Sequence, residues 1–140
     1  MSQQLPIIKI PKFITRSFIA SHREYIFVFG SDVHQQSFVG QSAQARGESN
    51  AFGVATKYRC CMQSNSFFYD DSLKNVVGGL IDTSISFIPR DGRPIILFPR
   101  IGQGCAELGV RSNTSKVLAY IQSELGKIAY KNVEYIDYAP

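Results

Sequence analysis

The sequence predicts one three-layer α/β domain over residues 1–140, with helices on both faces of a mixed, largely parallel central sheet. YIFVFG at 25–30 and RPIILFPR at 93–100 are continuous apolar runs, which is typical of strands buried on both faces. Segments with helical hydrophobic spacing alternate with these strands, and that alternation favours parallel pairing. A chain of 140 residues that is 44% hydrophobic and 19% charged has the composition of a folded domain with its own core.

The first half of the chain is expected to contain three strands and two short helices. LPIIKIPKFITR at 5–16 is rich in β-branched residues and is interrupted by Pro6 and Pro11, which suits a strand at a sheet edge. The strand at 25–30 follows. The other elements expected here are a two-turn helix at 16–24 with Ser17 as a possible cap, a helix at 37–46 and a strand at 51–57.

The second half is expected to add two longer helices and two strands. Apolar residues recur at helical spacing within 70–88 and again within 112–128. The strand at 93–100 separates these helices, and NVEYIDY at 132–138 forms the last strand. Helix N-caps are expected at Asp70 or Asp71 and at Ser112 or Asn113.

Several protein classes are disfavoured by composition. No apolar stretch approaches the roughly 20 residues of a membrane span, and the start of the chain lacks the pattern of a signal peptide, so a cytoplasmic protein that does not enter membranes is expected. Three cysteines, Cys60, Cys61 and Cys105, form neither a disulfide framework nor a zinc motif. We therefore expect no metal and no cofactor.

The charge favours an anionic partner without defining it. The formal net charge is +4, and the basic residues are spread along the chain rather than gathered in one run. Mild basicity of this kind suits a nucleotide as well as a nucleic acid. The oligomeric state is not readable from these features.

Two loops have the context of a ligand site. One leaves the strand at 25–30 and covers residues 30–41; the other leaves the strand at 93–100 and covers residues 100–111. In open α/β sheets, ligands bind in the crevice beyond the carboxyl ends of the strands. Glycines in both loops let backbone N–H groups approach an anion at a helix N-terminus, although Gly102 and Gly104 equally suit a plain turn.

The motifs of these loops, with RGESNAFGVATK and FFYDD between them, resemble an uncharacterised family that is frequent in phages and bacterial genomes. That family carries F-G-D-N, G-G-Q-A, R-G-E-x-N-A-x-G-x-P-T-K, F-F-x-D-A and D-G-I-G-T-G-L-A-x-L in this order, and the similarity spans roughly residues 13–125. The loop layout also resembles the macrodomains, whose two ligand loops hold the diphosphate of ADP-ribose. The resemblance implies a macro-like domain, possible phage origin, and a pocket for a nucleotide or ADP-ribose-type metabolite.

The resemblance and the loop positions together name the candidate ligand-binding residues: Gly30, Ser31, Asp32, Gly40, Gln41, Arg46, Asn50, Thr56, Lys57, Arg100, Ile101, Gly102, Gln103, Gly104 and Arg111. The chain departs from the family pattern at Ala55, Gln103 and Cys105, and Asp32 replaces a neutral residue. Because a carboxylate suits ribose hydroxyls and repels phosphate, Asp32 is expected to face the sugar.

Individual side chains admit a second interpretation. Arg46 is a candidate clamp for a phosphate, or it pairs with Glu48 or Asp70 to fix its loop. Lys57 ends a strand and so faces the expected crevice. Asp70 and Asp71 are helix caps or, together with Asp32, acid–base candidates.

Three functions remain open at this point. The leading one is binding of a nucleotide or ADP-ribose-type metabolite between the 30–41 and 100–111 loops. The second is hydrolysis of a bond to ribose in the same pocket, so the sequence leaves open whether the protein is an enzyme. The third is a small basic protein without catalysis that binds host nucleic acid or a host protein, and that version predicts affinity falling steeply with salt.

Overall fold

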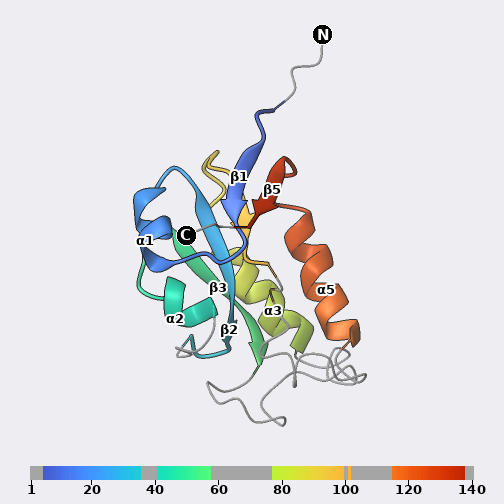
Figure 1. Cartoon of the computed structure of the whole chain (residues 1–140). Helices are drawn as coiled ribbons and strands as arrows, with labels where there is room; N and C mark the ends of the chain where they lie inside the picture. The colour runs from blue at the N-terminus through green and yellow to red at the C-terminus, as the bar shows by residue number, and fades with distance from the viewer. Residues whose placement is uncertain (1–4, 36–40, 58–76, 100, 102–114, 138–140) are drawn as a thin grey trace.

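The computed structural model describes residues 5–35, 41–57, 77–99, 101 and 115–137, and it confirms the α/β class. Strands and helices alternate along most of the chain (Figure 1). The elements are β1 (Ile8–Pro11), α1 (Arg16–Ser21), β2 (Ile26–Asp32), α2 (Gln41–Ala45), β3 (Ala51–Lys57), α3 (Val77–Ser86), β4 (Ile95–Leu97), α5 (Ser115–Gly126) and β5 (Val133–Ile136).

All strand pairings among the described residues are parallel. The larger sheet has the order β3-β2-β4, and β1 pairs with β5 in a second, two-stranded sheet. Two contacts join the second sheet to β4: the Tyr130 N–H donates to the Ile95 carbonyl at 3.0 Å, and the Tyr135 hydroxyl donates to the Leu97 carbonyl. Burial raises the pKa of Tyr135 to about 12, so this hydroxyl keeps its proton and remains a donor.

β2 is buried on both faces, as its continuous apolar sequence predicts. Ile26 and Val28 point into a cluster shared with α3 and α5, whereas Phe27 and Phe29 point into a cluster shared with β1 and α1. Figure 1 shows α1 and α2 on one side of the β3-β2-β4 sheet and α3 and α5 on the other. The result is the three-layer arrangement expected from alternating strands and helices.

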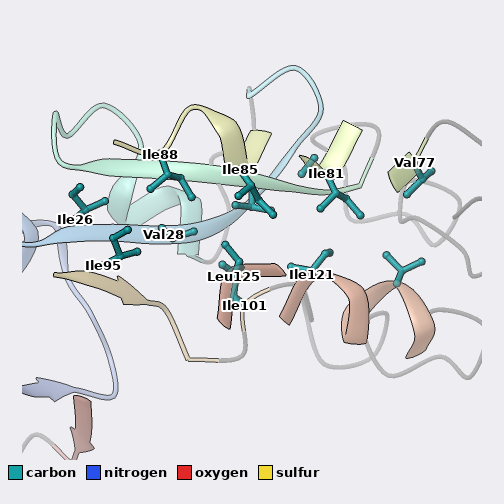
Figure 2. Close-up of a cluster of buried hydrophobic side chains, with 13 residues drawn as sticks. Ile26, Val28, Val77, Ile81, Ile85, Ile88, Ile95, Ile101, Ile121 and Leu125 are labelled. Atoms are coloured by element: carbon teal, nitrogen blue, oxygen red, sulfur yellow. The ribbon is translucent and has the colours of Figure 1, made fainter. Parts of the chain in front are cut away.

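The cluster beneath α3 and α5 is built from side chains at helical spacing. Ile81 and Ile85 of α3 face Ile121 and Leu125 of α5, and residues of β2 and β4 complete the contact (Figure 2). Each of these four side chains is buried, the most exposed being Ile85 at 6%. The predicted hydrophobic faces of both helices are therefore confirmed within the described residues.

Some element ends differ from the sequence prediction. Thr15, rather than Ser17, caps α1, because its hydroxyl oxygen accepts a hydrogen bond from the Phe18 N–H at 3.2 Å. β4 covers only Ile95–Leu97. The Pro94 carbonyl accepts from the Ile26 N–H, and the Phe98 N–H donates to the Val28 carbonyl, so the pairing with β2 extends by one residue at each end. The caps expected at 70–71 and 112–113 lie outside the described residues.

Across the described ranges, we find no helix whose length and apolarity would let it span a bilayer. The same residues contain no group of three or more His, Cys, Asp or Glu side chains arranged to hold a metal ion.

Candidate functional site

The carboxyl ends of β2 and β4 lie at the same end of the sheet. These two strands are parallel, and Val28 is in register with Leu97. Both strands therefore point toward the end of the sheet where the sequence predicts a crevice between two loops. Residues 36–40, 100 and 102–111 of those loops lie outside the described residues. Of the second loop the structure describes Ile101, which is 4% exposed and packs in the cluster of α3 and α5.

Arg46 is the central charged side chain at this end of the sheet. Its guanidinium lies over the Phe29 ring, 5.3 Å from the ring centroid, in a cation–π contact. One terminal nitrogen donates to the Ser31 hydroxyl, and the other donates to the Gln35 side-chain oxygen at 3.5 Å. These contacts come from β2 and the loop after it, so they fix the position of Arg46 at the carboxyl end of β2.

Asp32 acts electrostatically on this cation. It is 1% exposed, and its carboxylate accepts a hydrogen bond from the His34 N–H at 3.1 Å. Burial lowers the pKa of Arg46, and the charge of Asp32 acts in the opposite direction. A guanidinium stays protonated in proteins, so the site presents a partly desolvated positive charge.

Gln35, in the loop after β2, has a strained backbone, and its side chain links this loop to β3. Its φ is 57°, a left-handed conformation that costs a non-glycine residue about 1–3 kcal/mol. Its amide nitrogen donates to the Gly53 carbonyl at 3.2 Å, and its amide oxygen accepts the bond from Arg46. Such strain persists only where surrounding contacts hold it, and it is concentrated at ligand sites.

Gly53 is required by the close approach of these side chains. A Cβ atom at this position would lie 2.7 Å from the Ser31 Cβ and 3.2 Å from Phe29 Cε2, and it would also overlap the Gln35 side-chain oxygen. A glycine inside a strand is a sequence signal for such an approach. Gly53 thus allows Phe29, Ser31 and Gln35 to gather beneath Arg46.

A cavity of about 370 Å³ opens beside this cluster, and we call it the β3 cavity. Its volume lies within the range of small-molecule pockets. Arg46 and Gln35 supply polar groups, and Phe87 on its wall is 72% exposed. The lining residues are Phe29, Val33, Gln35, Arg46, Gly47, Ala51, Phe52, Gly53, Ala55, Leu80, Thr83, Ser84 and Phe87.

The outer edge of β3 forms part of the cavity wall. The Ala55 N–H donates to the Ser84 hydroxyl of α3 at 3.1 Å, and the Gly53 carbonyl accepts from Gln35. Side chains of α3 and of the loop after β2 therefore bond to backbone groups of β3 that a neighbouring strand would otherwise bond. These bonds hold α3 and the loop after β2 against the same edge of β3.

The segment before β3 has a different role. Glu48, which the sequence offers as a partner for Arg46, instead lies between Arg16 and Arg23 at 3.4 and 2.9 Å. Gly47 separates Arg46 from Glu48 with a φ of 96°, and this turn directs the two side chains to different neighbours. The other predicted partner, Asp70, lies outside the described residues.

Asn50 and Thr56, both predicted to bind a ligand, are buried and bonded to backbone. The Asn50 amide nitrogen contacts the carbonyls of Ile19, His22 and Tyr25 at 3.0–3.1 Å. The Thr56 hydroxyl donates to the Ser31 carbonyl at 3.1 Å. Both side chains hold the strands and loops that carry the site.

The remaining predicted residues are only partly described. Gly30 lies within β2, Gln41 begins α2 and Lys57 ends β3. The structure therefore brings Arg46 to Ser31 and Asp32 at the end of β2. The candidates outside the described residues are Gly40, Asp70, Asp71, Arg100, Gly102, Gln103, Gly104 and Arg111.

Sequence reasoning missed several residues of the β3 cavity. Phe52 lies in the strand expected at 51–57 and Phe87 in the helix expected at 70–88, and neither was named as a site residue. Gln35 lies in the predicted 30–41 ligand loop but was not itself named. Only Gly53 carried a usable signal, because a lone glycine interrupts an otherwise regular strand.

The described architecture defines a parallel α/β protein with a candidate ligand cavity along the outer edge of β3. Residues 9–124 match DUF7831, a family of unknown function, and the chain belongs to that family. No curated protein and no solved structure matches the chain at a significant level.

Proposed function

We propose that this protein binds a nucleotide or an ADP-ribose-type metabolite in the β3 cavity. The observation that carries the proposal is the placement of Arg46 on the wall of this cavity, at the carboxyl end of β2. Ligands of open α/β sheets bind at this end of the strands. The resemblance of the loop layout to macrodomains also supports a ligand of this class.

Arg46 would contact the phosphate. A guanidinium has five N–H donors in a planar fork that matches the oxygens of a phosphate. Phe29, Ser31 and Gln35 already hold this fork in place, so little conformational entropy is lost when an anion binds. A partly desolvated cation also attracts an anion more strongly than a cation in open water.

The base would contact the apolar wall. Phe52, Leu80 and Phe87 line the cavity with Arg46, and the 72% exposure of Phe87 leaves a large aromatic surface in contact with water. Covering such a surface with a nucleobase removes apolar area from water and permits ring stacking. A cavity that joins one fixed cation to aromatic side chains suits an anion with a flat ring.

The proposal is confined to binding. Asp32, the acid–base candidate that the structure describes, is buried and is not among the residues that line the β3 cavity. Its interaction with Arg46 and its bond from the His34 N–H give it a role in shaping the loop.

Isothermal titration calorimetry tests the proposal. The ligands are AMP, ADP, NAD, ADP-ribose, its cyclic forms and cyclic dinucleotides, each taken to millimolar concentration. We expect at least one to bind, with Arg46→Gln lowering its affinity by about tenfold or more, since hydrogen bonds to charged groups contribute roughly 1.5–3 kcal/mol. Arg46→Lys keeps the charge without the fork and is expected to fall between the two. Absence of binding across the panel contradicts the proposal.

A further inference from the structure

A second, basic surface lies at the amino end of β4 and shares no lining residue with the β3 cavity. The turn before β4 and the segment after α5 enclose an open hollow of about 550 Å³ around Pro94 and Ile95, at the amino end of β4. We call it the amino-end hollow. Its lining residues are Leu5, Arg90, Gly92, Arg93, Pro94, Ile95, Lys127, Ile128, Ala129, Tyr130 and Lys131.

The lining of the amino-end hollow contains four cations and no carboxylate. Arg90 and Arg93 come from the turn before β4, whereas Lys127 and Lys131 come from the segment that follows α5. The chain as a whole has 15 basic and 11 acidic residues, so a lining of one sign concentrates the positive charge of the protein here. Concentrated charge of one sign attracts a polyanion.

Two of these four cations form ion pairs with neighbouring carboxylates, and two do not. Arg93 pairs with Asp91 at 2.7 Å, and Lys127 pairs with Glu124 at 2.9 Å. The Lys131 amine donates to the Gly126 carbonyl, a neutral group. Among the described residues, neither Arg90 nor Lys131 forms an ion pair with a carboxylate, and both side chains are exposed.

The turn that carries the arginines is ordered by its own contacts. Asp91 accepts hydrogen bonds from both the backbone N–H and the Nε of Arg93, at 3.2 and 3.0 Å. Arg93 also donates to the Arg23 carbonyl at 3.4 Å. Gly92 has a φ of 95°, and a Cβ there would meet open space, so glycine is required by the turn conformation rather than by crowding.

We infer that the amino-end hollow binds the backbone of a single-stranded nucleic acid. Cations on two sides of the hollow would contact successive phosphates, while Pro94, Ile128 and Tyr130 offer apolar and aromatic surface to unpaired bases. This combination of positive charge and stacking surface is how proteins hold single strands without reading their sequence. An acidic protein segment would use the cations but has no bases to cover the apolar surface.

Fluorescence anisotropy with a labelled single strand of about 15 nucleotides, as RNA and as DNA, tests this inference. Arg90→Gln/Lys131→Gln removes two cations of the hollow. Lys9→Gln/Lys12→Gln removes the same net charge from β1 and the residue after it, outside the hollow, and is the matched control. Arg46→Gln is included because it affects the β3 cavity alone.

The wild type is expected to bind the strand with an affinity that falls as salt rises. For single strands, each phosphate contact adds about 0.7 to the steepness with which log affinity falls against log salt concentration. The ratio of the wild-type affinity to that of Arg90→Gln/Lys131→Gln is therefore expected to fall roughly 7-fold from 50 to 200 mM salt. The Lys9→Gln/Lys12→Gln and Arg46→Gln variants are expected to stay close to the wild type.

Three results overturn the inference. The first is absence of binding by the wild type at low salt. The second is an equal loss in both double variants, which indicates a response to net charge alone. The third is equally tight binding of poly-glutamate to the wild type with the same dependence on Arg90 and Lys131, which assigns the surface to an acidic protein partner.

Discussion

Arg23 and Arg46 both contact residues around β3, but their surroundings differ. Arg23 donates to Glu48, Ser49 and Asn50 at 2.8–2.9 Å, and these bonds tie the amino end of β3 to the chain before β2. Arg46 lies over an aromatic ring on the wall of a cavity. The stretch R-G-E-x-N therefore serves two regions: its last residues join the scaffold, and its first residue faces the candidate ligand site.

The comparison shows how one short motif divides the scaffold from the candidate site. Gly47 is the point of division, because its left-handed backbone turns the chain between Arg46 and Glu48. Glu48 and Ser49, which follow it, accept hydrogen bonds from Arg23, which is 25 or more residues away in the sequence. The residue before it is held by β2 and by the loop that follows β2.

The largest effect on stability is expected from Asn50→Ala in the scaffold region. The substitution removes the amide that contacts three backbone carbonyls and the oxygen that accepts from Arg23. Leaving such groups without partners is expected to lower the free energy of unfolding by about 3 kcal/mol, as measured by urea denaturation. Asn132→Ala, which removes one exposed bond to the Leu5 carbonyl, is the control and should cost under about 1 kcal/mol. An equal effect of the two substitutions would contradict the scaffold role.

A second substitution, Gly53→Ala, tests the packing of the cavity region. The added methyl group would meet Ser31 and Phe29, and it would displace the exposed Gln35 side chain from Arg46. Overpacking of this kind typically costs about 1–3 kcal/mol. Gly79→Ala on α3 meets nothing within 4 Å and should instead stabilise the protein by up to about 1 kcal/mol. Thermal unfolding of both variants measures the difference in stability. An unchanged unfolding temperature for Gly53→Ala would show that Ser31 and Phe29 do not crowd position 53.

The smallest stability effects, and the clearest separation of the two regions, are expected from the arginines themselves. Arg23→Gln loses bonds of a half-exposed side chain, and Arg46→Gln loses one cation–π contact and two hydrogen bonds. Each is expected to cost about 1 kcal/mol of unfolding free energy. Only Arg46→Gln is expected to weaken ligand binding in calorimetry. If Arg23→Gln is fully folded and yet loses ligand binding, the two regions do not have separate roles.

The sequence was informative where burial dictates the pattern. The apolar run before Asp32 predicted a strand covered on both faces, and Phe27 and Val28 occupy opposite clusters as expected. The parallel course of β2 and β4 followed from the same argument. Burial periodicity is a local property, so a single sequence contains it.

The candidate site was predictable only in part. Ser31, Asp32 and Arg46 were named in advance because they lie at the end of a strand or in a motif. The pairing of Glu48 with Arg16 and Arg23 was missed, because partners 25 and 32 residues apart leave no local signal. Phe87 was not singled out, because nothing local marks the residue after the last turn of α3 as part of a cavity wall.

Mapping of backbone amide chemical shifts by NMR, with ADP-ribose or AMP added to the labelled full chain, tests the central claim most directly. The account predicts shifts concentrated at residues 29–35, 46–55 and 80–87, which surround the β3 cavity. It also predicts that Arg46→Gln needs about tenfold or more ligand to reach the same shifts. Shifts confined to residues 90–95 and 127–131, or no shifts at millimolar ligand, would contradict it.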